Sequence, residues 1–314
     1  MILSIFFLCA GSLFLYGGAE SLVRGSSSLA LRLGLSSLVV GLTVVAFGTS
    51  APELAASVNA GLFGKGDIAI GNVLGSNIIN ICLILGIAAL VYPLHITRQI
   101  LKFDMPILLA ACLLFGLVFI NKSISRPQGL LLFAAICAYI SFSIVYARKH
   151  KNPRLLAEYS CAVPHITGTV WRDLSLVGAG CILLPVGSWI FVKGAIAIAA
   201  KAGLSDAVIG LTIVAAGTSL PELATSVVAT MRREPDIAIG NVVGSNIFNL
   251  LCIPGIAALV RPVLAPHISF IDIGIMSAIC ILLFIFMKTG YKLARWEGAL
   301  LLVVYAGYLT YLLV

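Results

Sequence analysis

Charged side chains are scarce in this sequence of 314 residues. Only 10% of the residues are charged and 61% are hydrophobic, whereas a soluble domain has about 25% charged and about 45–50% apolar residues. A chain with so little polar surface does not fold as a water-soluble domain. Apolar runs of about 20 residues recur from end to end, each long enough to cross a hydrocarbon core about 30 Å thick. The composition therefore predicts an integral membrane protein.

The sequence also lacks the patterns of disulfide frameworks, zinc sites and hydrolytic enzymes. Its eight cysteines are scattered singly with no C-x-x-C pair, which favours a role as small apolar filler. Its four histidines, His95, His150, His165 and His267, all fall in predicted loops. No nucleophile–base pair and no set of metal-ligating histidines supports an enzyme. We therefore expect neither catalysis nor a cofactor.

Ten apolar segments predict an all-α polytopic fold with ten transmembrane helices. The predicted spans are residues 1–32, 36–62, 67–92, 101–121, 127–147, 172–200, 206–231, 236–260, 268–287 and 296–314. The first span is too long for a signal peptide and no cleavage-like site follows it, so we interpret it as a retained, tilted helix.

The basic residues that give the chain its net charge of +8 predict its orientation. With the amino terminus outside, thirteen Lys and Arg residues fall in inner loops: Arg32, Arg98, Lys102, Arg148, Lys149, Lys151, Arg154, Arg172, Arg232, Arg233, Lys288, Lys292 and Arg295. Five fall in outer loops: Lys65, Lys122, Arg126, Lys201 and Arg261. The positive-inside rule then predicts both termini outside, in a bacterial-type inner membrane. The cluster at 148–154 is interpreted as a topology signal with some attraction to anionic lipid, rather than as a nucleic-acid site.

One segment of the chain is repeated. Residues 41–80 and 210–249 align without a gap at an offset of 169, and 27 of the 40 positions are identical. Five predicted spans separate equivalent points, and because five is odd the second copy enters the membrane in the opposite orientation. Inverted repeats of this kind place their matched segments together near the bilayer midplane, where secondary transporters bind substrate. We therefore predict two five-helix repeats, 1–147 and 172–314, joined by a cytoplasmic connector at 148–171.

Each repeat places a glutamate deep inside an apolar span. Glu53 and Glu222 both lie in the motif G-T-S-x-P-E, and an ionisable residue at mid-bilayer is functional by default because burying it costs about 2.5–3.5 kcal/mol. Thr49 and Thr218 each precede their glutamate by four residues and share its helix face, with Ser50 and Ser219 beside them. The prolines of the two motifs should loosen the helices and free backbone carbonyls to face a cation.

A second polar face follows in each repeat, within the motif G-N-V-x-G-S-N-I-x-N. Ser76 and Asn80 lie four residues apart, as do Ser245 and Asn249. The other amides of the motif, at positions 72, 77, 241 and 246, are interpreted as interhelical contacts in preference to ligands. Carboxylate, hydroxyl, amide and carbonyl oxygens together suit Ca²⁺ and also Na⁺, and the absence of His and Cys from the set argues against zinc or copper.

Three further acidic residues are interpreted as structural. Asp67 and Asp236 begin predicted spans and are expected to cap them. Glu20 is expected to pair with Arg24, one helical turn later.

These motifs resemble the two α-repeats of the calcium/cation antiporter superfamily, in particular prokaryotic sodium/calcium exchanger-like proteins. The resemblance covers nearly the whole chain and implies four central sites shared alternately by Na⁺ and Ca²⁺. The positions that match the family's ligands are the carbonyls of Ala46 and Ala215 and the side chains of Thr49, Ser50, Glu53, Ser76, Asn80, Thr218, Ser219, Glu222, Ser245 and Asn249. The resemblance also implies that spans one and six slide across the core to alternate access.

One departure from the family pattern affects the function predicted. The family commonly has Asp at the last position of one repeat, where this chain has Asn80 and Asn249, so the site keeps two carboxylates. We predict an antiporter, functional as a monomer, that exchanges Ca²⁺ for Na⁺ across the lipid bilayer. A Ca²⁺/H⁺ antiporter is an alternative, since a buried Glu can carry a proton. A K⁺-dependent Na⁺/Ca²⁺ antiporter is another. A cation channel is an alternative of a different class, although channels often line their pores with rings of like groups from several subunits.

Overall fold

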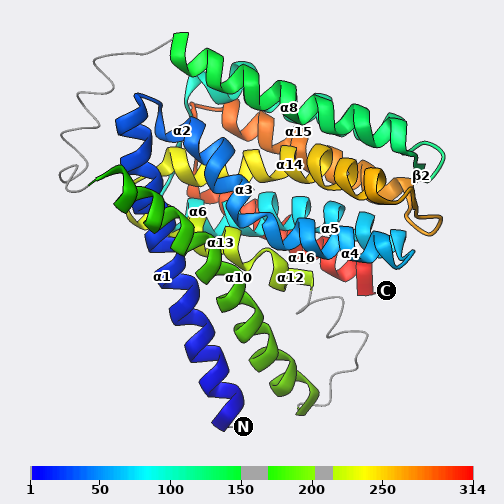
Figure 1. Cartoon of the computed structure of the whole chain (residues 1–314), viewed down its shortest axis with the longest axis horizontal. Coiled ribbons are helices and arrows are strands. Elements are labelled where there is room, and N and C mark those ends of the chain that lie inside the picture. The colour runs from blue at the N-terminus through cyan, green and yellow to red at the C-terminus, as the bar shows by residue number, and fades with distance from the viewer. Residues whose placement is uncertain (1, 150–168, 202–214, 314) are drawn as a thin grey trace.

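The computed structural model describes residues 2–149, 169–201 and 215–313, which form a bundle of helices with four very short strands (Figure 1). Most of the predicted connector at 148–171 and the first nine residues of the predicted seventh span at 206–231 lie outside the described residues.

The elements of the first half run from α1 to α8, and three of them are π-helical segments, labelled η. They are α1 (Ile2–Leu33), α2 (Ser37–Val40), η1 (Gly41–Val45), α3 (Ala46–Thr49), α4 (Ala51–Leu62), α5 (Gly66–Ile78), η2 (Ile79–Leu85), α6 (Gly86–Val91), β1 (Leu94–His95), η3 (Ile100–Asp104), α7 (Met105–Val118), β2 (Ser123–Ile124) and α8 (Arg126–Lys149).

The second half follows a similar order. Its described elements are α10 (Val170–Lys201), α12 (Ala215–Thr218), α13 (Leu220–Met231), α14 (Pro235–Val260), β3 (Val263–Leu264), α15 (Phe270–Lys288), β4 (Lys292–Leu293) and α16 (Arg295–Leu313).

Seven helices of the described residues are long and apolar enough to cross a membrane. They are Ile2–Leu33, Gly66–Val91, Ile100–Val118, Arg126–Lys149, Val170–Lys201, Pro235–Val260 and Phe270–Lys288. An eighth span would come from the pair Ser37–Thr49 and Ala51–Leu62, which is bent by 46° at the break between them. The chain is therefore an integral, multi-pass membrane protein, and each of the seven helices corresponds to a predicted span.

Two of these helices form the centre of the bundle. In the most apolar window of Gly66–Val91, 78% of the residues are buried, and in that of Pro235–Val260 the share is 89%. These are the helices that carry the second polar motif of each repeat, so its side chains are enclosed by protein.

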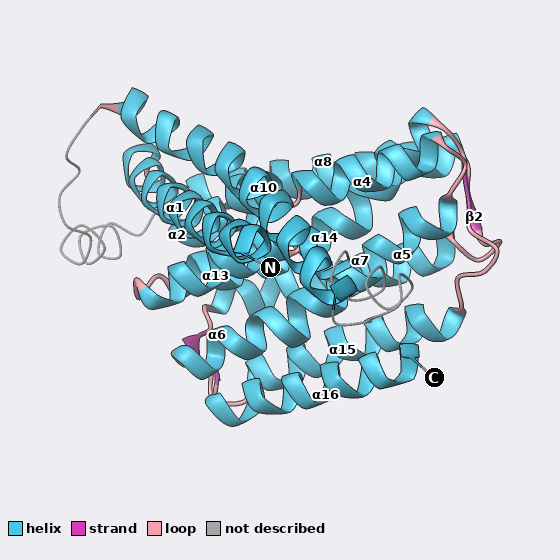
Figure 2. Ribbon diagram, turned by 90° about the horizontal axis from the view of Figure 1, so that it is seen from below, coloured by secondary structure: helices cyan, strands magenta, loops and turns pink. Residues whose placement is uncertain are grey.

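The helices α1 and α10 form a close pair that projects from the rest of the bundle (Figure 1). They run antiparallel, because Gly11 approaches Phe191 whereas Gly25 approaches Asp173. A Cβ atom at Gly11 would lie 2.6 Å from the backbone nitrogen of Phe191, which is too close for any side chain, so this spacing requires glycine. Glycines recur every seventh residue along the contact, at Gly11, Gly18 and Gly25 of α1 and at Gly180, Gly187 and Gly194 of α10. Viewed from below, the pair lies away from α15 and α16 (Figure 2).

The four short strands pair across the two halves of the chain. Strand β1 pairs antiparallel with β4, with Leu94 opposite Leu293. Strand β2 pairs antiparallel with β3, with Ile124 opposite Val263. Adding the repeat offset of 169 to Leu94 gives position 263, and subtracting it from Leu293 gives position 124, so one pair becomes the other. His95, predicted in a loop, is part of β1.

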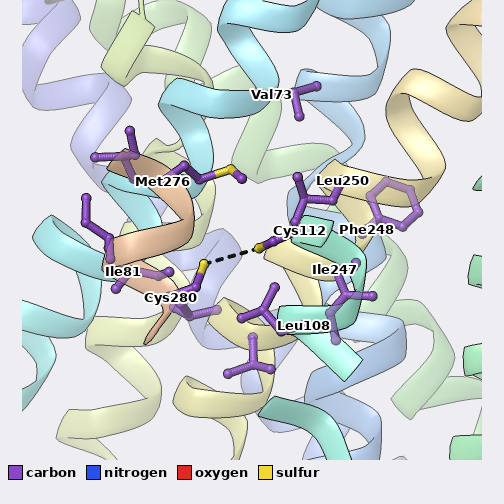
Figure 3. Packing of buried hydrophobic residues seen from close by; sticks show 14 of the residues in the cluster. Val73, Ile81, Leu108, Cys112, Ile247, Phe248, Leu250, Met276 and Cys280 are labelled. Atoms are coloured by element: carbon purple, nitrogen blue, oxygen red, sulfur yellow. Dashed lines mark hydrogen bonds between the residues drawn. The ribbon is translucent and has the colours of Figure 1, made fainter. Parts of the chain in front are cut away.

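A large apolar cluster fills the space between the central helices and α7, α8 and α15. Figure 3 shows part of it, where Leu108 and Cys112 of α7 face Cys280 of α15. The sulfur atoms of Cys112 and Cys280 lie 3.6 Å apart, and both residues are buried. The cysteines at this point serve as small apolar residues, which is the role expected from the sequence.

Candidate functional site

Each G-T-S-x-P-E motif breaks its helix at the serine. The break in the first half separates α3 from α4 at Ser50, which has φ −83° and ψ 6°. The break in the second half separates α12 from α13 at Ser219, which has φ −89° and ψ 5°. Both serines occupy the bridge region of backbone space, where many active-site residues lie. Pro52 and Pro221 follow in the first turn of α4 and α13, which confirms the predicted loosening of the helix.

The two glutamates are held by hydroxyls from the opposite half of the chain. Glu53 and Glu222 are 1% and 0% exposed. The Oγ of Ser50 donates to Oε1 of Glu222 at 2.9 Å, and the Oγ of Ser219 donates to Oε1 of Glu53 at 3.2 Å. The carboxyls are also close enough to interact electrostatically. The two motifs therefore meet, as predicted from the repeat.

The threonines and two asparagines form a second exchange of the same kind. Thr49 donates to Oδ1 of Asn241 at 2.9 Å, and Thr218 donates to Oδ1 of Asn72 at 3.4 Å. Asn72 in turn donates to the backbone oxygen of Glu53 at 3.3 Å. Asn241 makes the matching bond to the backbone oxygen of Glu222 at 3.4 Å. These asparagines connect the central helices to the glutamate-bearing ones, which is the role preferred for them from the sequence.

Several buried oxygen atoms of the site have no hydrogen-bond partner among the described residues. One oxygen of each glutamate, Oε2, is unpartnered although fully enclosed. The same holds for other side chains that were predicted as ligands, with both amide atoms unpartnered in the two asparagines: Ser76, Asn80, Ser245 and Asn249. Buried polar atoms are nearly always paired, so this set of unpaired oxygens, carried by helices that contact one another, indicates a position for a group that satisfies them.

The backbone carbonyls near the breaks are less free than predicted. The oxygen of Ala46 accepts from the backbone nitrogen of Ser50 at 3.0 Å and from Oγ1 of Thr49 at 3.3 Å. Ala215 begins α12. The carbonyl of Gly217 accepts from Oγ of Ser188 on α10, which ties the projecting pair to the site.

The remaining asparagines of the motif, Asn77 and Asn246, are also buried, and Oδ1 of Asn77 has no partner among the described residues. Nδ2 of Asn77 donates to the sulfur of Met276 on α15 at 3.6 Å, so its side chain faces α15. Neither amide atom of Asn246 has a partner among the described residues.

Asp67 and Asp236 lie in the first turn of α5 and α14, as predicted, but the N-cap residues of these helices are Lys65 and Glu234. The carboxylate of Asp67 accepts from the backbone nitrogen of His267 at 2.9 Å and contacts the ring nitrogen at 3.0 Å. In α14 the N-cap residue is Glu234, two residues before Asp236. A partner 200 residues away in sequence outweighs the local cap, and no local pattern reveals it.

The predicted pair of Glu20 and Arg24 is confirmed, at 2.6 Å. Glu20 also forms an ion pair with Arg232, at the end of α13. This second contact, which the sequence did not reveal, connects α1 to the helix that carries Glu222.

Three further buried polar residues were missed from the sequence. Ser57 and Ser226 accept from Asn72 and Asn241, both at 3.0 Å. Because both matching repeat positions are serine, the sequence could have indicated their role. Asp104 is 1% exposed and accepts from the hydroxyl of Tyr139 at 3.1 Å. Its signal was a single carboxylate within an apolar run.

The fold and the site together define a multi-pass helical membrane protein with a buried, oxygen-lined site that carries two carboxylates. Comparison with known proteins identifies its family. The sodium/calcium exchanger protein family matches residues 3–145 and 173–314, and the chain belongs to this family. This confirms the resemblance to the calcium/cation antiporter superfamily.

Relatives and solved structures match over nearly the full chain. The putative antiporter CaxA of Alkalimonas amylolytica is 38% identical over 98% of this chain and 98% of its own. The sodium/calcium exchanger MaX1 of Methanosarcina acetivorans is 34% identical, with 97% of each chain covered. A structure of the sodium–calcium exchanger NCX_Mj, soaked without Na⁺ and Ca²⁺, has a TM-score of 0.85 at 32% identity and covers 99% of both chains.

Proposed function

We propose that this chain exchanges Ca²⁺ for Na⁺ across the membrane as a secondary antiporter. The observation that carries the proposal is the set of buried, unpartnered oxygens around Glu53 and Glu222. Ca²⁺ takes six to eight oxygen ligands, and the site offers carboxylate, hydroxyl, amide and backbone carbonyl oxygens. Membership of the exchanger family supports the same function.

The proposed ligands are the ones that the sequence and the family resemblance indicate. Glu53 and Glu222 supply the charge. The neutral oxygens come from the backbone of Ala46 and Ala215 and from the side chains of Thr49, Ser50, Ser76, Asn80, Thr218, Ser219, Ser245 and Asn249. The ions are substrates, and the proposal assigns the protein neither a cofactor nor catalysis. An ion at the Ala46 carbonyl would have to compete with the hydrogen bonds from Ser50 and Thr49.

The proposed architecture is ten transmembrane helices in two inverted repeats, 1–147 and 172–314, with a cytoplasmic connector at 148–171. The reciprocal strand pairs support it, because the pair Leu94–Leu293 becomes Ile124–Val263 when the halves are exchanged. The reciprocal bonds from Ser50 and Ser219 support it in the same way. A two-fold relation between the halves explains both sets.

We place both termini on the outer face of a bacterial-type inner membrane and expect a monomer to be functional. The excess of basic residues in the predicted inner loops supports this orientation. Alkaline phosphatase fused after residue 314 should be active, whereas phosphatase fused within 148–171 should be inactive. The opposite pattern would reverse the proposed topology.

Alternating access is assigned to the pair α1–α10, which we propose slides across the core as one body. The continuous glycine contact keeps the two helices together. Contacts from the pair to the core are fewer and include Ser188 to Gly217 and Glu20 to Arg232. If these contacts to the core change, the pair can move while the interface between α1 and α10 stays closed.

The function is tested by uptake of radioactive Ca²⁺ into Na⁺-loaded proteoliposomes. Replacing either Glu53 or Glu222 by Gln removes one of the two charges that hold Ca²⁺, so each variant should lose at least about tenfold in uptake. Glu297→Gln is a matched control, because Glu297 caps α16 and Gln128 makes the equivalent contacts in the first half. Uptake that persists in both site variants would contradict the mechanism, and a large Ca²⁺ current that needs no Na⁺ gradient would instead favour a channel.

A further inference from the structure

The ion site contains two charged groups among the described residues. Glu53 and Glu222 are buried, and their described hydrogen-bond partners are neutral, including the hydroxyls of Ser50 and Ser219 at the carboxylates and the amides of Asn72 and Asn241 at the backbone. The fixed charge of the site is therefore −2 when both glutamates are ionised.

The other buried acids are committed elsewhere. Asp104 accepts from Tyr139 and Gln99, and Asp173 pairs with Arg32 at 2.5 Å. Two more, Glu297 and Asp236, lie in the first turns of α16 and α14 respectively. Asp236 precedes Ser245 by nine residues, which is about 13 Å along a helix. None of the contacts described for these acids reaches Glu53 or Glu222.

Asn80 and Asn249 occupy the positions at which a further charge could enter the site. Both are 0% exposed, and all four of their amide atoms lack a partner among the described residues. An amide offers a carbonyl oxygen to a cation but adds no charge. Because the two residues occupy matching repeat positions, neither half of the chain supplies a third carboxylate to the site among the described residues.

We propose that each turnover exchanges two Na⁺ for one Ca²⁺ and moves no net charge, and that Asn80 and Asn249 fix this ratio. The proposal rests on the Ca²⁺/Na⁺ antiport proposed above. One Ca²⁺ or two Na⁺ neutralises the two glutamates, so either loaded site is neutral overall. A third Na⁺ would leave a net charge of +1 in an enclosed, low-dielectric site, where an uncompensated charge is strongly disfavoured.

The same charge count predicts tight coupling. An empty site with both glutamates ionised carries −2, and moving it through the occluded state would expose two uncompensated charges to a low-dielectric surrounding. The neutral, loaded forms avoid this penalty. The carrier should therefore change orientation only when it is loaded with one Ca²⁺ or with two Na⁺.

The ratio is measured as steady-state Ca²⁺ accumulation in Na⁺-loaded proteoliposomes, with the membrane potential clamped by valinomycin and K⁺. A tenfold Na⁺ gradient should support about 100-fold Ca²⁺ accumulation, and clamping the potential between zero and about 60 mV should not change it. With a third Na⁺, accumulation should approach about 1,000-fold and shift about tenfold with the same potential. The same K⁺ gradients without valinomycin control for transport of K⁺ itself.

Asn249→Asp tests whether these residues set the ratio. A third carboxylate lets a third Na⁺ be neutralised, so accumulation should become sensitive to potential, about tenfold per 60 mV. Asn80→Asp should do the same. Asn77→Asp is the matched control, because Asn77 faces Met276 of α15; it should stay insensitive to potential.

Each result decides between the proposals. Na⁺-driven uptake that is independent of potential and follows the square of the Na⁺ gradient supports a two-for-one exchange. Na⁺-driven uptake that shifts with potential in the unmodified protein overturns the ratio but leaves the antiport intact. Uptake driven by a pH gradient and not by Na⁺ overturns both the ratio and the Na⁺ coupling, and no Ca²⁺ uptake under any gradient overturns the antiport itself.

Discussion

Each carboxylate of the site depends on a side chain from the other half of the chain. Ser50 donates to Glu222 and Ser219 donates to Glu53. The sequence predicted these four residues as neighbours within each motif, and the repeat predicted that the motifs would meet. It did not predict the exchange of partners, because that depends on how the two broken helices face one another in space. Among the predicted ligands, the ion contacts themselves stay predictions.

Removing either serine hydroxyl should weaken ion binding by a similar amount. A hydrogen bond to a charged group contributes about 1.5–3 kcal/mol, so Ser50→Ala and Ser219→Ala should each raise the Ca²⁺ concentration for half-maximal uptake by about tenfold or more. Ser141→Ala is the control, because Ser141 is exposed and bonds only to the carbonyl of Cys137 on its own helix. Uptake as a function of Ca²⁺ concentration measures the effect. A defect in only one of the two variants would argue against equivalent roles.

The helices and their breaks were largely predictable from the sequence, but the π-helical segments within them were not. Apolar length located the seven long helices, and proline located the breaks at Ser50 and Ser219. The π-helical segment η2, which contains Asn80, had no sequence signal. The matching stretch of α14 holds the same motif in an α-helix, so the residues of the motif do not by themselves specify the π form. Irregular turns of this type are frequent at functional sites.

The glycines of the α1–α10 contact should be intolerant of side chains, and a neighbouring glycine should tolerate them. A Cβ at Gly18 would meet Leu183 and Leu184 at 3.0 Å, whereas a Cβ at Gly17 would have no atom within 4 Å. Gly18→Leu should therefore destabilise the protein by about 1–3 kcal/mol. Gly17→Leu should be neutral or stabilising by up to about 1 kcal/mol, because Gly weakens a helix. Thermal unfolding in detergent compares the variants, and equal losses would contradict close packing at Gly18.

At the scale of the whole molecule, two ion pairs distinguish the α1–α10 pair from the core. Arg32 and Asp173 join α1 to α10 within the pair. Glu20 and Arg232 join α1 to α13, and Ser27 of α1 donates to Glu234 in the turn after α13 at 3.2 Å. Burial raises the pKa of Glu234. The last two contacts must break if the pair slides over the core, whereas the first need not.

Cross-links at these two ion pairs should therefore have opposite effects. In a variant without the eight native cysteines, Glu20→Cys with Arg232→Cys would be bridged by a reversible bifunctional thiol reagent, and Arg32→Cys with Asp173→Cys would be bridged in the same way. The first bridge fixes the pair to the core and should reduce Ca²⁺ uptake at least about tenfold, with recovery on reduction. The second bridge lies inside the moving body and should leave uptake within about twofold of the unbridged protein. Because the chemistry is the same and only the joined bodies differ, equal inhibition by both bridges would show that α1 and α10 do not move as one body.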